Sequence, residues 1–133
     1  YSIWCAMQIP IFESLIACGF PSPAQDHIER RLSLDAELIR YPESTYFLRA
    51  SGNSMKEAGV LDGDLLVVES HLTPKQGDIV VAEYNGEFTC KYLQIHPVRA
   101  LIPANQAFET LLITEDMDIQ IFGIVRYAVH TCR

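Results

Sequence analysis

The alternation of apolar and polar residues changes character near residue 40. Beyond that point, short apolar runs alternate with turn-forming residues, which is typical of β-strands joined by tight turns. Asn85-Gly86 separates two of these runs and favours the type I′ turn of a β-hairpin. Residues 41–133 are therefore predicted to form one mainly β domain, with strands at 46–50, 64–70, 78–84, 87–95, 99–104, 110–114 and 119–130.

Residues 1–40 follow a different pattern. The first 20 residues are apolar and short of turn signals. Ser22 and Pro23 favour the start of a helix, and the apolar residues Ile28 and Leu32 follow at helical spacing, so a short helix is predicted around residues 23–32. We interpret residues 1–40 as an extended N-terminal arm carrying this helix, which lies on the β domain or reaches away from it.

The net charge of the chain argues against direct binding to DNA. The 133 residues suit one domain, and their net charge is −7, with ten basic residues against seventeen acidic ones. The basic runs do not exceed Arg30-Arg31, whereas binding to phosphates needs clustered Lys and Arg. We expect the protein to act at DNA only through a partner.

Hydropathy points to a cytoplasmic protein without a membrane span. No apolar run approaches the roughly 20 residues that a spanning helix needs. The apolar start lacks the basic region of a signal peptide, so it is not interpreted as one. Because the chain does not begin with Met, the presence of residues before Tyr1 stays open.

Cysteine and histidine spacing predicts neither a metal site nor another cofactor. There is no C-x-x-C pair and no compact cluster of zinc-binding spacing. Isolated cysteines behave as small apolar residues, so reduced thiols are expected. The residues concerned are Cys5, Cys18, Cys90, Cys132, His27, His71, His96 and His130.

The stretch SGNSM follows the first predicted strand and contains Ser54. Serines in such clusters usually stabilise turns, but a serine after a strand can also be a nucleophile if a neighbouring group takes its proton. The second glycine of a G-x-S-x-G elbow is absent, with Lys56 in its place. A histidine partner stays open without support from the pattern.

The three lysines are the other candidate proton acceptors. Lys56 and Lys75 lie in polar stretches, whereas Lys91 lies in the strand predicted at 87–95, on the same face as Thr89. Because both faces of this strand are largely apolar, partial burial is expected to lower the pKa of Lys91 and to suit it as a general base. Spacing alone equally allows a lysine that protects a sheet edge or extends to water.

The motifs SGNSM, LDGDLLVVES and GDIVVAEYNGEFTCKYLQ resemble the Ser–Lys self-cleaving peptidases related to LexA. Over residues 11–133 the chain resembles one branch of that family, the UmuD proteins, which are accessory subunits of the error-prone DNA polymerase V. The resemblance includes IFESLIACGFPSPAQDHIERRLSL, PANQAF and IFGIVRYAVH, in the same order.

This resemblance implies a role for each matching residue. Ser54 matches the nucleophile, Lys91 the general base, and Cys18-Gly19 the bond that these proteins cut in themselves. The turn that carries Ser54 and Met55 is the expected source of backbone N–H donors for the oxyanion. One departure is Tyr92, which follows the lysine where a second lysine is common in this branch.

The resemblance also implies a fold and partners. The fold is a twisted, β-rich, LexA-like peptidase domain that forms homodimers. RecA filaments on single-stranded DNA stimulate cleavage of the arm, and the trimmed dimer joins a UmuC-like Y-family polymerase for translesion synthesis.

Three other classes of protein share some of these features. A type I signal peptidase needs a membrane anchor. A LexA-type repressor needs a helix-turn-helix domain, for which the first 40 residues are too few and too acidic. A non-catalytic homodimeric module that regulates a polymerase has the same composition, but Ser54 and Lys91 in register disfavour it. The position of the arm, cleavage in cis or in trans, and the polymerase served stay open.

Overall fold

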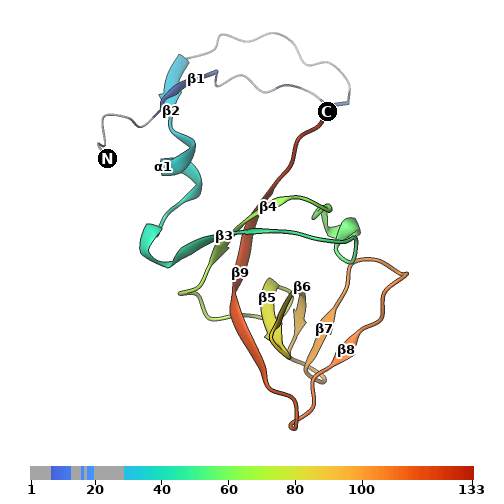
Figure 1. Ribbon diagram of the computed structural model, residues 1–133. Coiled ribbons are helices and arrows are strands. Elements are labelled where there is room, and N and C mark those ends of the chain that lie inside the picture. The colour runs from blue at the N-terminus through green and yellow to red at the C-terminus, as the bar shows by residue number, and fades with distance from the viewer. Residues whose placement is uncertain (1–6, 13–15, 17, 20–28) are drawn as a thin grey trace. The chain divides into compact units, whose positions relative to one another are not determined.

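A computed structural model describes residues 7–12, 16, 18, 19 and 29–133. It divides the chain into two compact units, residues 1–40 and residues 41–133, and each is described by itself. In the first unit, β1 (Ile9–Phe12) and β2 (Glu29–Leu32) form a two-stranded antiparallel sheet, and α1 (Leu34–Leu38) follows (Figure 1).

The helix predicted at residues 23–32 is wrong for residues 29–32, and residues 23–28 lie outside the described part of the chain. The prediction used the caps and two apolar residues one helical turn apart. The structure instead pairs Glu29–Leu32 with Ile9–Phe12, placing Ile9 opposite Leu32. Hydrogen bonds to a distant strand outweigh so weak a local preference.

The second unit is built on a seven-stranded antiparallel sheet, so the prediction of a mainly β fold is confirmed. The strand order is β3-β4-β9-β5-β6-β7-β8, with every neighbouring pair antiparallel (Figure 1). Each of the seven predicted strands is present. Their bounds are β3 Thr45–Arg49, β4 Leu65–Glu69, β5 Ile79–Tyr84, β6 Glu87–Gln94, β7 Ala100–Ile102, β8 Leu111–Leu112 and β9 Ile119–Val129.

The predicted hairpin is confirmed. Strands β5 and β6 pair antiparallel, with Tyr84 opposite Glu87 and only two residues between them. Asn85 has a φ of 54° and Gly86 a φ of 78°. Both positive values are those that a type I′ turn requires. This turn sets the register that places Lys91 opposite Val80.

Two irregularities bend the sheet around its long central strand, β9. Register shifts occur opposite Val67/Val68 of β4 and opposite Val81/Ala82 of β5. An extra residue in one strand of a pair increases its bend and twist. Gly123 of β9 lies at the second shift, and a Cβ there would meet a Val68 methyl at 2.6 Å.

Strands β3 and β6 are brought together by this bending. Four strand spacings separate them in the sheet, which is about 19 Å in a flat sheet. Nevertheless, Leu48 of β3 and Phe88 of β6 line the same pocket. A buried apolar cluster contributes Met55, Val60, Leu66 and Val81 to the lining of this pocket, and Val68 is its fifth buried member.

Candidate active site

The turn after β3 carries Ser54 and is fixed at both ends. Gly52 has a φ of 87°, which an L side chain rarely adopts, and its N–H donates to Asp62 Oδ1 at 2.7 Å. Met55 is buried in the apolar cluster, and the 3₁₀ turn η3 (Lys56–Ala58) begins directly after it. Ser54 therefore lies between a hydrogen-bonded glycine and a buried anchor.

A second segment holds the backbone of this turn from the side. The N–H of Ala104 donates to the carbonyl of Ser54 at 2.7 Å, and the Nδ2 of Asn105 donates to the carbonyl of Asn53 at 2.8 Å. The N–H of Glu57 in turn donates to the carbonyl of Ala104 at 2.8 Å. The loop after β7 is thus tied to the turn by three hydrogen bonds.

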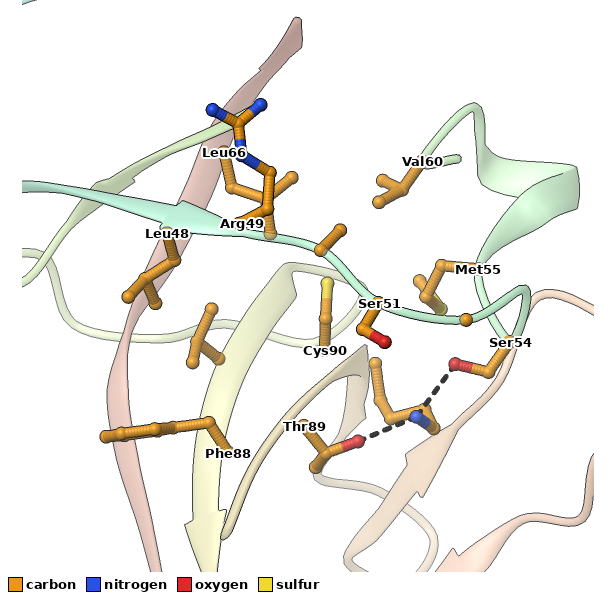
Figure 2. A pocket seen from close by; sticks show the side chains of 14 residues that line it. Leu48, Arg49, Ser51, Ser54, Met55, Val60, Leu66, Phe88, Thr89 and Cys90 are labelled. Atoms are coloured by element: carbon orange, nitrogen blue, oxygen red, sulfur yellow. Dashed lines mark hydrogen bonds between the residues drawn. The ribbon is translucent and has the colours of Figure 1, made fainter. Parts of the chain in front are cut away.

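Lys91 approaches Ser54 from strand β6. Its Nζ lies 2.9 Å from Ser54 Oγ and 2.7 Å from Thr89 Oγ1. Figure 2 shows both hydrogen bonds as dashed lines that end at the hydroxyl oxygens of Ser54 and Thr89, which accept them. Thr89 and Lys91 share a strand face, as expected from their spacing. The structure therefore brings together the two side chains that the sequence singled out, from positions 37 residues apart.

Burial changes the acidity of the lysine. Lys91 is partly buried, as expected, and desolvation lowers its pKa from the ordinary 10.5, with a smaller opposing effect from the neighbouring Cys90. A lower pKa increases the neutral fraction of the amine near neutral pH. The other two lysines are exposed and do not line this pocket.

The alternative of a histidine partner finds no support in the described residues. Those that line the pocket around Ser54 include no histidine. His71 contacts Ser44 and the buried Glu69, and His130 lies 3.0 Å from the buried carboxylate of Asp64. The described part of the chain also contains no group of three or more His, Cys, Asp or Glu side chains arranged for a metal ion.

A pocket of about 250 Å³ opens beside Ser54 and Lys91. Most of its lining is apolar, which suits uncharged side chains, and Arg49 and Lys91 are its two cationic residues (Figure 2). Its lining residues are Leu48, Arg49, Ala50, Ser51, Gly52, Ser54, Met55, Val60, Leu66, Val81, Phe88, Thr89, Cys90 and Lys91.

Sequence reasoning treated Cys90 as an ordinary apolar cysteine and missed its place in this pocket. Burial raises the pKa of its thiol to about 11, with a smaller opposing effect from Lys91. The thiol therefore stays protonated and uncharged near neutral pH. The only signal in the sequence was its position next to Lys91.

The other two residues of the expected chemistry lie in the first unit. Cys18 and Gly19 are both exposed. The geometry described above is built from the second unit alone, so the role of Cys18-Gly19 as the bond cut stays a prediction.

Comparison with known proteins fits this geometry. The model of the Peptidase S24-like family matches residues 10–126. The chain belongs to the Peptidase S24-like family. Members of this family are Ser–Lys self-cleaving peptidases.

The matches to similar proteins span most of this chain and most of each relative. The chain is 50% identical over 124 residues to protein SamA of Salmonella typhimurium, a match spanning 93% of this chain and 86% of SamA. It is 46% identical over 124 residues to protein ImpA of Escherichia coli (93% and 85%), and 42% identical over 122 residues to protein MucA of Escherichia coli (91% and 84%). All three are UmuD-like proteins.

One further finding concerns membranes. Within the described residues, no helix of this S24 family member is long and apolar enough to cross a bilayer.

Proposed function

We propose that the chain cuts itself between Cys18 and Gly19, with Ser54 as nucleophile and Lys91 as general base. One observation supports this above all: Lys91 Nζ lies 2.9 Å from Ser54 Oγ in a partly buried setting that lowers the pKa of the amine. A nucleophile and a base within hydrogen-bonding distance are the minimum for acyl transfer.

The proposed reaction proceeds in two steps. Neutral Lys91 takes the proton of Ser54 as Oγ attacks the carbonyl carbon of Cys18. The resulting ammonium returns that proton to the departing amine of Gly19, which leaves an ester between Ser54 and Cys18. Lys91 then takes a proton from water, whose oxygen attacks the ester, and gives that proton to Ser54 Oγ as the ester bond breaks. The new acid at Cys18 releases its own proton to solvent. The products are a fragment ending in the carboxylate of Cys18 and a chain that begins at Gly19.

The negative charge on the carbonyl oxygen of Cys18 needs donors in both steps. We assign the backbone N–H groups of Ser54 and Met55 to this role. In the described part of the chain, neither N–H donates a hydrogen bond to another protein group, which leaves both open to a substrate oxygen.

The pocket supports an apolar peptide as substrate. Its lining suits the composition of the segment Ile16–Gly19, in which every side chain is small or uncharged. An extended peptide is held at low cost by pairing with a strand edge. Strand β7 pairs with β6 only at Tyr92–Gln94, so the first half of β6, up to Lys91, has no partner from β7 on that side.

The wider role that we infer is that of a homodimeric accessory subunit in the mutagenic branch of the response to DNA damage. The similarity to UmuD-like proteins supports this role. A RecA filament on single-stranded DNA would promote cleavage, and a UmuC-like Y-family polymerase would receive the trimmed dimer. Sedimentation of the Ser54→Ala chain tests the dimer, and a monomer at micromolar concentration would contradict it.

Intact-mass measurement during incubation at alkaline pH tests the cleavage. The expected product begins at Gly19, and Ser54→Ala and Lys91→Ala each abolish it. The double variant is no worse than either single one, because nucleophile and base act as a unit. Lys56→Ala, which removes an exposed lysine of the same turn, is the matched control and cleaves normally.

Other results would redirect the proposal. Cleavage that persists in Lys91→Ala at neutral pH removes the lysine from the mechanism. A wild-type chain that stays intact, even with RecA, single-stranded DNA and ATP, supports a non-catalytic homodimeric module. Tight operator binding by a longer chain supports the LexA-type repressor fragment.

A further inference from the structure

The segment Ala104–Asn105 holds two successive carbonyl groups of the nucleophile turn. Asn105 Nδ2 donates to the carbonyl of Asn53 at 2.8 Å, and the N–H of Ala104 donates to the carbonyl of Ser54 at 2.7 Å. The side-chain oxygen of Asn105 accepts the N–H of Ala107 at 3.0 Å, which fixes which end of the amide faces the turn.

Holding these carbonyls also orients two N–H groups. The carbonyl of Asn53 belongs to the same peptide plane as the N–H of Ser54, and the carbonyl of Ser54 to the same plane as the N–H of Met55. Both peptide bonds are trans, and in a trans peptide the C=O and N–H bonds point in opposite directions. Both N–H groups therefore point away from Ala104 and Asn105.

We propose that Asn105 is a positioning residue for the oxyanion site, aiming the Ser54 N–H by holding the carbonyl of Asn53. The inference rests on the proposed self-cleavage and adds a residue to which the dyad gives no role. Asn105 does not touch the reacting atoms. It acts through the Asn53–Ser54 peptide, whereas Ala104 holds the next peptide with its backbone and so is insensitive to its own side chain.

The contribution of Asn105 is separable from that of the surrounding turn. The N–H of Lys56 also reaches the carbonyl of Asn53, at a longer 3.2 Å, so the turn keeps one hydrogen bond when the Asn105 amide is removed. We therefore expect the variant to stay folded while the peptide plane rotates. Because a donor must meet the oxyanion within a few tenths of an ångström, a small rotation reduces the rate strongly.

The test compares Asn105→Ala and Asn105→Asp with the wild-type chain. Alanine removes the donor without adding charge; aspartate keeps the shape and the acceptor for Ala107 but places an oxygen against the carbonyl of Asn53. Gln106→Glu makes the same amide-to-carboxylate change at the exposed neighbour and is the matched control. Self-cleavage rates are measured by intact mass from neutral to alkaline pH, and folding by urea denaturation.

The expected result is a lower maximal rate of self-cleavage, with the midpoint of its pH profile unchanged. Asn105→Ala lowers the rate plateau by about tenfold to a hundredfold, without moving the pH midpoint, because Lys91 is untouched. Asn105→Asp loses at least as much, and Gln106→Glu stays within about twofold of wild type, since it alters neither peptide plane. Labelling of Ser54 by a small fluorophosphonate falls in parallel, because its phosphoryl oxygen uses the same donors and needs no arm.

Two outcomes overturn the inference while the proposed cleavage stands. In one, wild type cleaves and the plateau rate of Asn105→Ala stays within about twofold of the wild-type plateau rate. In the other, cleavage falls but fluorophosphonate labelling does not, so that Asn105 acts on the arm instead. A wild-type chain that neither cleaves nor labels fails at the proposed function, which is a different result. If urea shows Asn105→Ala to be unfolded, Asn105→Asp decides.

Discussion

At the scale of single residues, the proposed chemistry depends on the protonation of one amine. Burial lowers the pKa of Lys91 from 10.5, and in the proposed mechanism only the neutral amine takes the proton of Ser54. The cleavage rate should therefore rise with pH, about tenfold per unit while the ammonium predominates, and reach a plateau at a midpoint below 10.5. The Cys90 thiol, with a pKa of about 11, stays uncharged through most of this range. Rates from intact mass between neutral and alkaline pH check the profile, and a flat profile excludes the lysine base.

Thr89 gives the second prediction at this scale. Its hydroxyl lies 2.7 Å from Lys91 Nζ, and a neutral amine that donates to Thr89 turns its lone pair toward Ser54. Thr89→Val keeps the shape and removes this hydrogen bond, worth about 1 kcal/mol, so the plateau rate should fall about fivefold. Thr110→Val, an exposed threonine away from the pocket, serves as the control. Equal rates in Thr89→Val and wild type would show that packing alone orients the lysine.

Residues with local patterns could be found from the sequence, and residues defined by long-range contacts could not. Ser54 follows a strand, and Lys91 stands out as a cation in an apolar strand, so both were predicted. Asn105 holds Asn53 from 52 positions away, and nothing within PANQAF distinguishes that contact from an ordinary Asn turn. Cys90 was missed as a pocket residue because the pocket forms only when distant strands meet.

At the scale of elements, short apolar runs with turn residues between them predicted all seven strands of the second unit. The Asn85-Gly86 turn was the clearest case, because its backbone requirement is local. The helix at residues 23–32 failed for its last four residues, and β1 was not foreseen, because both depend on a pairing between Ile9–Phe12 and Glu29–Leu32. Neither four-residue segment carries a decisive pattern alone.

The bend of the sheet at β9 depends on Gly123, which has no room for a side chain. In Gly123→Ala, the new Cβ meets Val68 Cγ1 at 2.6 Å and the Glu69 carbonyl oxygen at 2.9 Å, and both of these residues are fully buried. Because one close atom is backbone, the strand must shift, and the free energy of unfolding should fall by about 2–3 kcal/mol. Urea denaturation followed by circular dichroism, in the Ser54→Ala background, measures the loss.

Gly86→Ala is the comparison for this strand variant. Its Cβ meets nothing within 4 Å, so the cost comes only from its φ of 78° and should be about 1 kcal/mol. If Gly123→Ala were no more costly than Gly86→Ala, the close approach of β9 to β4 would not be what requires glycine there.

At the scale of the whole molecule, the proposed cleavage would remove many apolar residues and very little charge. The segment before Gly19 contains one acidic residue, Glu13, and neither Lys nor Arg, so its removal takes the net charge from −7 only to −6. Both forms therefore carry a charge that repels phosphates. The removed segment is otherwise rich in apolar and aromatic residues, including Trp4 and Phe12.

The loss of apolar residues with little change in charge should affect binding to the polymerase and leave binding to DNA unchanged. The chain that begins at Gly19 should bind its polymerase more tightly than uncut Ser54→Ala, and the ratio of the two affinities should change little with salt, because almost no charge distinguishes them. Neither form should bind duplex DNA measurably at physiological salt. Fluorescence anisotropy with labelled polymerase and labelled duplex, each across a salt series, measures both quantities. A ratio that collapses as salt rises would make the difference electrostatic, and tight, salt-sensitive binding to the duplex would revive the repressor alternative.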